Sequence, residues 1–157
     1  MEIRPIDPAD RSRIDEFIIS RWFTMKMVVR GESVDLGSAD GFYACDGDGI
    51  TGLITFRFSG NEMEILSLDS VPENRGTGTA LLDAAVMRAK ESGAGRVVLI
   101  TTNDNLAALR FYQKHGFDMA HLYRNAVDRA RQIKPEIPLT GMGGIPLKHE
   151  IELEMTL

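Results

Sequence analysis

The hydrophobic and polar positions near the start of the chain predict a strand followed by an amphipathic helix. Residues 2–6 have the pattern of a short strand, and Asp7 and Pro8 then suit the cap and the first position of a helix. The apolar residues that follow at helical spacing are Ile14, Phe17, Ile18 and Trp22. A helix is therefore expected to residue 22, whereas residues 23–40, broken by glycines, receive no assignment.

From residue 41 the pattern changes to that of strands. Apolar-rich stretches at 41–45, 50–58 and 62–71 are separated by two short turns, at 46–49 and 59–61. The first turn contains two Asp-Gly pairs, which suit a left-handed backbone, and the second contains Gly60. Three strands joined by tight turns predict an antiparallel meander.

The next part of the chain alternates helices with strands. The expected elements are a helix over 79–92, a buried strand over 96–101, a helix capped by Asn103 or Asp104 and running to His115, and a strand over 117–123. Gly93 and Gly95 end the first of these helices, and Gly116 ends the second. Alternation of Ile151, Leu153 and Met155 with glutamates predicts a final strand.

The segment 124–148 is irregular. It contains a short helical pattern at 125–133 and is then rich in proline and glycine, which indicates turns. Its apolar residues argue against disorder, so we expect either a wall of a substrate pocket or a flap that covers a sheet edge or contacts a second copy in a homodimer. Without a linker or repeat, residues 1–157 are predicted to form a single domain.

Composition and charge exclude some classes of function. The net charge of −5, from 18 basic and 23 acidic residues, argues against nucleic acid as a partner and is compatible with a cationic amine. The single cysteine, Cys45, cannot form an internal disulfide and is expected to be buried. The N-terminus lacks a signal peptide pattern, and no apolar run is long enough for a membrane span, so a cytoplasmic location is predicted. The three histidines show no spacing typical of a metal site.

A strand, a glycine-containing turn and a helix start follow one another over residues 68–82, and this arrangement favours phosphate binding. The amide groups of a first helical turn attract anions, and Arg75 adds a positive charge. A Walker-type site would need Lys after Gly78, which Thr79 replaces. A dinucleotide fingerprint would need a third glycine or an alanine at the position of Leu81.

Two segments resemble the signatures of the GNAT acetyltransferase family. Residues 75–80, Arg-Gly-Thr-Gly-Thr-Ala, are similar to its Arg/Gln-x-x-Gly-x-Gly/Ala signature, and Pro72 stands where members often have proline. Residues 105–117 resemble its Asn-x-x-Ala-x-x-Phe-Tyr-x-Lys-x-Gly-Phe segment. Both lie in the expected order, so the resemblance covers most of residues 1–123 and implies an α/β fold with a mixed, mostly antiparallel, twisted sheet and helices on both faces.

The resemblance implies an acetyl-CoA site and a set of residues around it. The main chain of Leu68, Asp69 and Ser70 would hold the pantetheine arm and the thioester, and Asn105 would contact the same arm. Tyr112 would act as the general acid on the leaving thiolate. The pyrophosphate would bind to the turn and helix start, formed by Arg75, Gly76, Thr77, Gly78, Thr79, Ala80 and Leu81.

The general base is expected among the carboxylates of the strand before the turn. Glu62 and Glu64 share one face of that strand, because side chains alternate, and either could act directly or through water. Asp69 would lie on the opposite face from Glu64 unless a bulge resets the phase. His115 and His121 are further candidates.

These observations predict an N-acetyltransferase that moves an acetyl group from acetyl-CoA directly to the primary amine of a small molecule or peptide, without a metal. Two alternatives stay open. One is a non-catalytic module that binds acyl-CoA, and the other is an enzyme that transfers a longer acyl chain. The acceptor is not identified by any of these residues.

Overall fold

The computed structural model describes residues 1–72 and 75–157 and has a mixed α/β fold. Its strands are β1 (Glu2–Pro5), β2 (Lys26–Val29), β3 (Glu32–Asp35), β4 (Asp40–Asp46), β5 (Gly49–Ser59), β6 (Glu62–Ser70), β7 (Arg96–Thr102), β8 (Asp118–Tyr123) and β9 (Glu150–Thr156). The described α-helices are α1 (Arg11–Trp22), α2 (Thr77–Glu91), α3 (Leu106–Lys114) and α4 (Ala126–Ile133).

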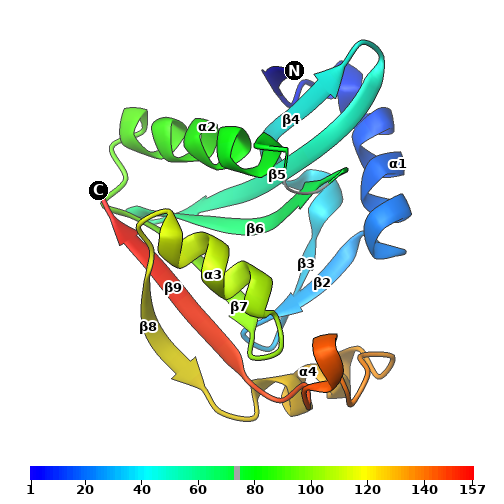
Figure 1. Ribbon diagram of the computed structural model, residues 1–157, viewed down its shortest axis with the longest axis vertical. Helices are drawn as coiled ribbons and strands as arrows, with labels where there is room; N and C mark the ends of the chain where they lie inside the picture. The colour runs from blue at the N-terminus through cyan, green and yellow to red at the C-terminus, as the bar shows by residue number, and fades with distance from the viewer. Residues whose placement is uncertain (73–74) are drawn as a thin grey trace. The chain divides into compact units, whose positions relative to one another are not determined.

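The main sheet has seven strands in the order β1-β4-β5-β6-β7-β9-β8, and β2 and β3 form a separate pair (Figure 1). The pairs β1–β4, β4–β5, β5–β6 and β8–β9 are antiparallel. The predicted mostly antiparallel α/β fold is thus confirmed. The chain divides into two compact units, one comprising residues 1–26, 35–97 and 157 and the other residues 27–34 and 98–156. The single-domain organisation stays a prediction.

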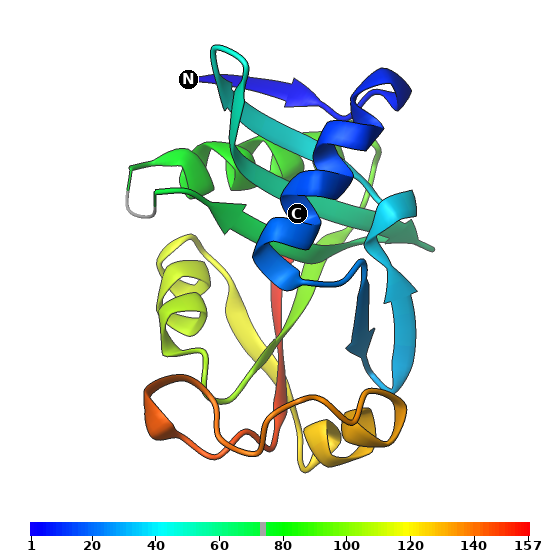
Figure 2. The same ribbon diagram turned by 90° about the vertical axis from the view of Figure 1, so that its right-hand side faces the viewer.

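In the first unit, α1 and α2 cover opposite faces of the meander formed by β4, β5 and β6 (Figures 1 and 2). Each helix buries part of the apolar face that its sequence predicts, Ile14 and Ile18 in α1 and Leu81 and Ala85 in α2. Trp22 at the end of α1 and Met87 in α2, which the pattern also placed on these faces, are exposed. The expected start of α1 is also confirmed, since the Asp7 side chain accepts a hydrogen bond from the Ala9 amide and Pro8 follows it. One turn of 3-10 helix, Pro8–Asp10, precedes the α-helix.

The hairpin of β2 and β3 occupies part of the stretch that the pattern left unassigned. Its turn is Arg30-Gly31, with φ angles of 51° and 72°. Two successive residues with positive φ are typical of a two-residue hairpin turn, but Arg rarely adopts this backbone, so the sequence carries no usual turn signal.

In the second unit, the cap of α3 lies one residue after the second of the two positions that the sequence predicted. The cap is Asn105, whose side chain accepts a hydrogen bond from the Ala108 amide at 3.1 Å, and the prediction of Asn103 or Asp104 is wrong. Those two side chains are already engaged with the segment 124–148. Asn103 Oδ1 accepts hydrogen bonds from the amides of Lys148 and His149, and Asp104 Oδ2 accepts one from Met142.

The segment 124–148 is ordered around Arg131. This guanidinium donates to the carbonyls of Ile137, Pro138 and Leu147 at 2.6–3.2 Å, and its side chain is 14% exposed. Residues 139–147 form a small hairpin through the bridge of Thr140 to Pro146, with a 3-10 turn at Met142–Gly144. The predicted short helix is confirmed as α4. In the irregular part that follows, Arg131 supplies hydrogen bonds to main-chain carbonyls that strands and helices would otherwise supply.

Replacing Arg131 with Met is expected to loosen residues 134–147 while leaving the sheet folded. Methionine keeps most of the stem but leaves three carbonyls without their donor, which costs about 1–3 kcal/mol for partly buried groups. Hydrogen exchange measured by mass spectrometry should rise in this segment. The matched control is Arg129→Met on the same helix, where the side chain is exposed. Equal exchange in both variants would contradict the role of Arg131.

Candidate functional site

A β-bulge divides β6 into two parts with different side-chain phase. Thr55 of β5 pairs with Ser67, but the next residue, Phe56, pairs with Ile65, so Leu66 is the extra residue. Residues that face Leu53, Thr55 and Arg57 of β5 share one face of β6. On β6 these partners are Asp69, Ser67 and Glu64, in the same order. The bulge therefore resets the phase, and Asp69 lies on the same face as Glu64.

Glu62 and Glu64 are both engaged with arginines. Glu64 is 5% exposed and lies opposite Arg57, which donates to its Oε1 from both Nε and Nη2 at 2.9 Å. Glu62, at the start of β6, accepts from Arg96 Nε at 2.5 Å. The two predicted base candidates are thus on one face, as expected, and each has a cationic neighbour.

Asp69 lies near the other end of β6, beneath the last turn of α1. Its Oδ2 accepts a hydrogen bond from Trp22 Nε1 at 2.6 Å, and Arg21 Nε lies 3.8 Å from its Oδ1. The Asp69 side chain is 16% exposed. Phe23 follows directly, with a φ of 60° and an exposure of 88%. A carboxylate is consequently held beside the indole of Trp22 at the C-terminal end of α1.

The start of α2 packs closely on β5. A Cβ atom at Gly52 would lie 2.7 Å from Thr77 Cγ2 and 2.9 Å from Leu81 Cδ1, so only glycine admits this approach. Gly76 precedes the helix with a φ of 81°, a backbone that favours glycine, and no described side chain caps the first turn. The helix begins two residues earlier than predicted. Thr77 to Ala80 therefore form its first turn, Leu81 follows, and Arg75 is exposed just before the helix. Residues 73 and 74 of the stretch 68–82 lie outside the described residues.

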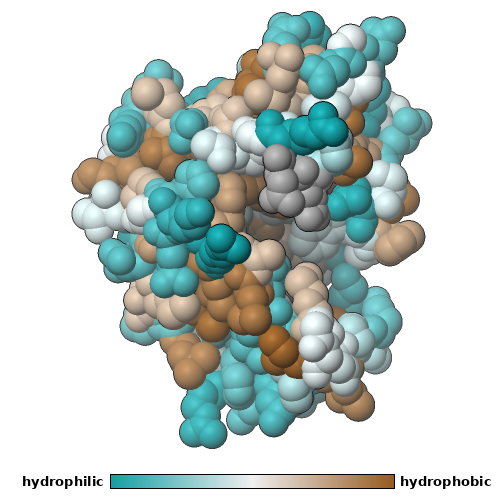
Figure 3. Space-filling model, viewed as in Figure 1, coloured by the Kyte–Doolittle hydropathy of each residue, from teal (hydrophilic) through white to brown (hydrophobic). Residues whose placement is uncertain are grey.

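Tyr112 and Asn105 belong to α3 in the second unit. The Tyr112 ring is 7% exposed and makes edge contacts with Phe111 and Phe117, at centroid distances of 5.2 and 5.4 Å. Asn105 uses its Oδ1 as the helix cap, which leaves its amide group as the part that can donate to a ligand. Hydrophobic side chains gather over α3 in the space-filling view (Figure 3). Leu106, the first residue of α3, is exposed.

Sequence patterns missed a buried polar cluster in the second unit. Glu150 and Glu152 of β9 are each 4% exposed, although their alternation with apolar residues is typical of a solvated face. Arg30 donates from Nη2 to Glu152 at 3.0 Å and from its main-chain amide to Glu150. The Tyr123 hydroxyl also donates to Glu152, and burial, followed by the charge of this carboxylate, raises the pKa of Tyr123. Nothing local in the sequence pairs β9 with a turn 120 residues earlier.

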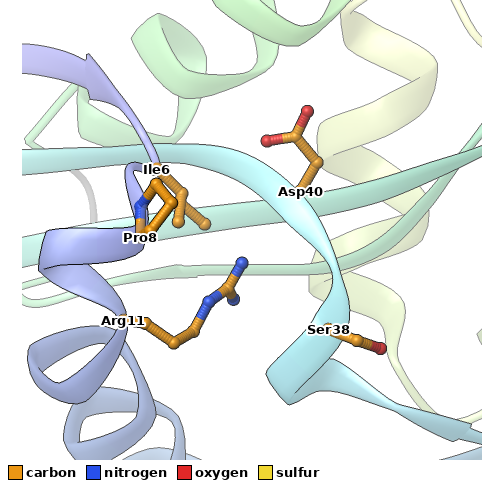
Figure 4. Close-up of a pocket in the computed structure, with 5 residues that line it drawn as sticks. All are labelled: Ile6, Pro8, Arg11, Ser38 and Asp40. Carbon is orange, nitrogen blue, oxygen red and sulfur yellow. The ribbon is translucent and has the colours of Figure 1, made fainter.

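A cavity of about 390 Å³ opens at the other end of α1 and is lined by Ile6, Pro8, Arg11, Ser38 and Asp40. Arg11 extends from α1 toward the segment that carries Ser38 and Asp40 (Figure 4), where its Nη2 donates to the Ala39 carbonyl. None of these five lining residues is among the predicted site residues, so the cavity is not the predicted cofactor site.

Three further observations concern the described residues. Cys45 is buried and unpaired, as expected of a small apolar residue. Residues 1–72 and 75–157 contain no cluster of three or more His, Cys, Asp or Glu side chains that could hold a metal ion. None of the helices described has the length and apolar character that crossing a bilayer requires.

Comparisons with known proteins identify the family of this chain. Residues 11–117 match the model of the acetyltransferase (GNAT) family. The uncharacterized protein YdhI of Bacillus subtilis is 41% identical over 152 residues, which covers 96% of this chain and 95% of that protein. A Bacillus subtilis acetyltransferase solved in complex with CoA is 18% identical with a TM-score of 0.73, covering 99% of this chain and 98% of the other. A GNAT family acetyltransferase from Elizabethkingia anophelis with acetyl-CoA bound is 22% identical with a TM-score of 0.69, covering 99% and 97%. The chain belongs to the GNAT acetyltransferase family.

Proposed function

We propose that this protein transfers an acetyl group from acetyl-CoA to a primary amine of a small molecule or peptide. The observation that carries the proposal is the start of α2. A left-handed glycine precedes it, no described side chain caps it, and Gly52 of β5 lets it approach the sheet closely. Such a helix start offers amide donors and a positive dipole to a pyrophosphate. Two family members of the same fold, from Bacillus subtilis and Elizabethkingia anophelis, were solved with CoA and acetyl-CoA.

In this proposal the pyrophosphate binds the first turn of α2, and the main chain of Leu68–Ser70 holds the thioester arm together with Asn105. The amine attacks the thioester carbonyl directly, main-chain donors stabilise the oxyanion, and Tyr112 protonates the leaving thiolate. The carboxylates Glu62, Glu64 and Asp69 share one face of β6 and are the candidates for the general base. No metal takes part, and the reaction takes place in the cytoplasm.

The proposal is tested by binding and by turnover. Calorimetric titration with CoA should show a single site per chain, and release of CoA from acetyl-CoA, followed with a thiol reagent, should depend on added amine. The amine panel should include butylamine, phenethylamine, spermidine and a lysine peptide. Absence of CoA binding would refute the proposal outright.

Two alternative functions give other results in the same experiment. CoA binding without turnover on any amine would favour a non-catalytic acyl-CoA-binding module. Faster turnover with butyryl-CoA or octanoyl-CoA than with acetyl-CoA would favour transfer of a longer acyl chain, because the start of α2 contacts only the part common to all these thioesters.

A further inference from the structure

We propose that Asp69 is the carboxylate that binds the acceptor's ammonium group and takes its proton, and this inference rests on the proposed acetyl transfer. It selects one residue from the three carboxylates on the same face of β6. The selection depends on position along the strand, on charge and on the neighbours of each carboxylate.

Position along β6 separates the three candidates. If the main chain of Leu68–Ser70 holds the thioester, the side chain of Asp69 is attached to the same stretch. A strand rises about 3.3 Å per residue, and the partners of Glu64 and Glu62 on β5 stand four and six residues from the partner of Asp69, so Glu64 lies roughly 13 Å away and Glu62 roughly 20 Å away. A base must come within hydrogen-bond reach of the attacking nitrogen, directly or through one water. Without the bulge at Leu66, Asp69 would face α2 rather than α1. Glu64 would then be the carboxylate nearest to Leu68–Ser70 on the face that α1 covers.

The arginine partners separate them further. Glu64 receives two donors from Arg57 and is 5% exposed, so a second cation would displace a buried ion pair. Glu62 has Arg96 at 2.5 Å. At Asp69 the contacts include a hydrogen bond of 2.6 Å from the neutral indole of Trp22 and the Arg21 guanidinium at 3.8 Å. The Arg21 pair is longer than the arginine pairs of Glu62 and Glu64, and the indole donor fixes the orientation of the carboxylate without cancelling its charge.

The surroundings of Asp69 suit an alkylammonium ligand. Trp22, which donates to Asp69, is 37% exposed, so an aromatic side chain lies beside a partly open carboxylate. Phe23 follows Trp22 in the chain and is 88% exposed. Aromatic faces attract organic cations as well as apolar chains. Phe23 adopts a left-handed backbone that bulky residues rarely occupy, and such conformations cluster at functional sites.

The protons and bonds of the transfer balance in the following way. The acceptor nitrogen loses one proton to Asp69, and its lone pair then forms the C–N bond with the thioester carbonyl carbon. The nitrogen loses a second proton as the amide forms, and the C–S bond breaks. One proton ends on the CoA sulfur, through Tyr112, and the other passes from Asp69 to the solvent.

The single tryptophan of the chain makes binding at Asp69 directly observable. Because the only indole N–H donates to Asp69, its NMR signal and the tryptophan fluorescence should shift when butylammonium, phenethylammonium or spermidine binds to the CoA complex. The uncharged N-acetyl forms of these amines should give a much smaller shift. In Asp69→Asn, which retains an acceptor oxygen for Trp22, the amine-dependent shift should disappear.

Turnover in the same variants completes the test. Asp69→Asn should lower kcat/KM for the amine by about 100-fold or more, the usual range for a positioned base, while CoA affinity stays near that of the wild type. Asp83→Asn, an exposed carboxylate of α2, is the matched control and should behave as the wild type. A larger rate loss in Glu62→Gln or Glu64→Gln than in Asp69→Asn, or an unchanged amine-dependent shift in Asp69→Asn, would overturn the assignment. If the wild-type protein did not bind CoA, the proposed function itself would be refuted.

Discussion

Replacing Tyr112 with Phe is expected to lower turnover by about 10²–10⁴-fold, the usual contribution of a positioned acid. The ring of Tyr112 packs edge-on against Phe111 and Phe117 in the interior of the second unit, and phenylalanine keeps these contacts. The change removes only the hydroxyl, so the affinity for acetyl-CoA should stay within about threefold. Steady-state kinetics and calorimetry on the same preparation measure the two quantities.

Tyr123→Phe is the control for that experiment. It removes a hydroxyl from another tyrosine of the same unit, where the group donates to Glu152. Its effect should be on stability, seen as a lower Tm. If Tyr112→Phe and Tyr123→Phe changed turnover equally, the proton donor would have to be another group or water.

Placing Val at Gly78 is expected to lower CoA affinity by about 100-fold, equivalent to about 2.7 kcal/mol. Gly78 is the second residue of α2, and a branched side chain there would occupy the space through which a pyrophosphate approaches the helix amides. Glycine is a poor helix former, so the substitution should not weaken the helix itself. Titration calorimetry with CoA measures the loss, and circular dichroism checks the fold.

The matched control introduces the same side chain on the exposed face of α2, as Asp83→Val. This variant should bind CoA as the wild type does. Wild-type affinity in a folded Gly78→Val protein would show that the ligand does not approach the first turn of α2.

The spacing of hydrophobic residues predicted those helices and strands that are determined by the local sequence. The meander and α1 follow from alternating or helical spacing, and Asp7 marks the helix start as expected. The cap of α3 could not be predicted in this way, because Asn103, Asp104 and Asn105 are all good caps. Long-range hydrogen bonds to residues 142–149 engage the first two and leave the third for the helix.

The glycine turn and the α3 segment were recognisable in sequence because their chemistry is local. The base was not, since its identity depends on one extra residue in β6 and on a donor from α1. The buried state of Glu150 and Glu152 was equally hidden. Their partner Arg30 lies about 120 residues earlier, in a turn without the usual Asn-Gly or Asp-Gly signal.

The extra residue at Leu66 also determines how relatives of this protein should be aligned. Counting back from the glycine turn gives the correct facing of Asp69 and Ser67, whereas counting forward from Glu62 reverses it. In a homologue that lacks the extra residue, the side chains on one side of the missing position would point to the opposite face of the strand. The residue at the position of Asp69 would then face α2 even if every acidic residue were retained. Whether a relative has the same acceptor site therefore depends on the number of residues in this strand as well as on their identity.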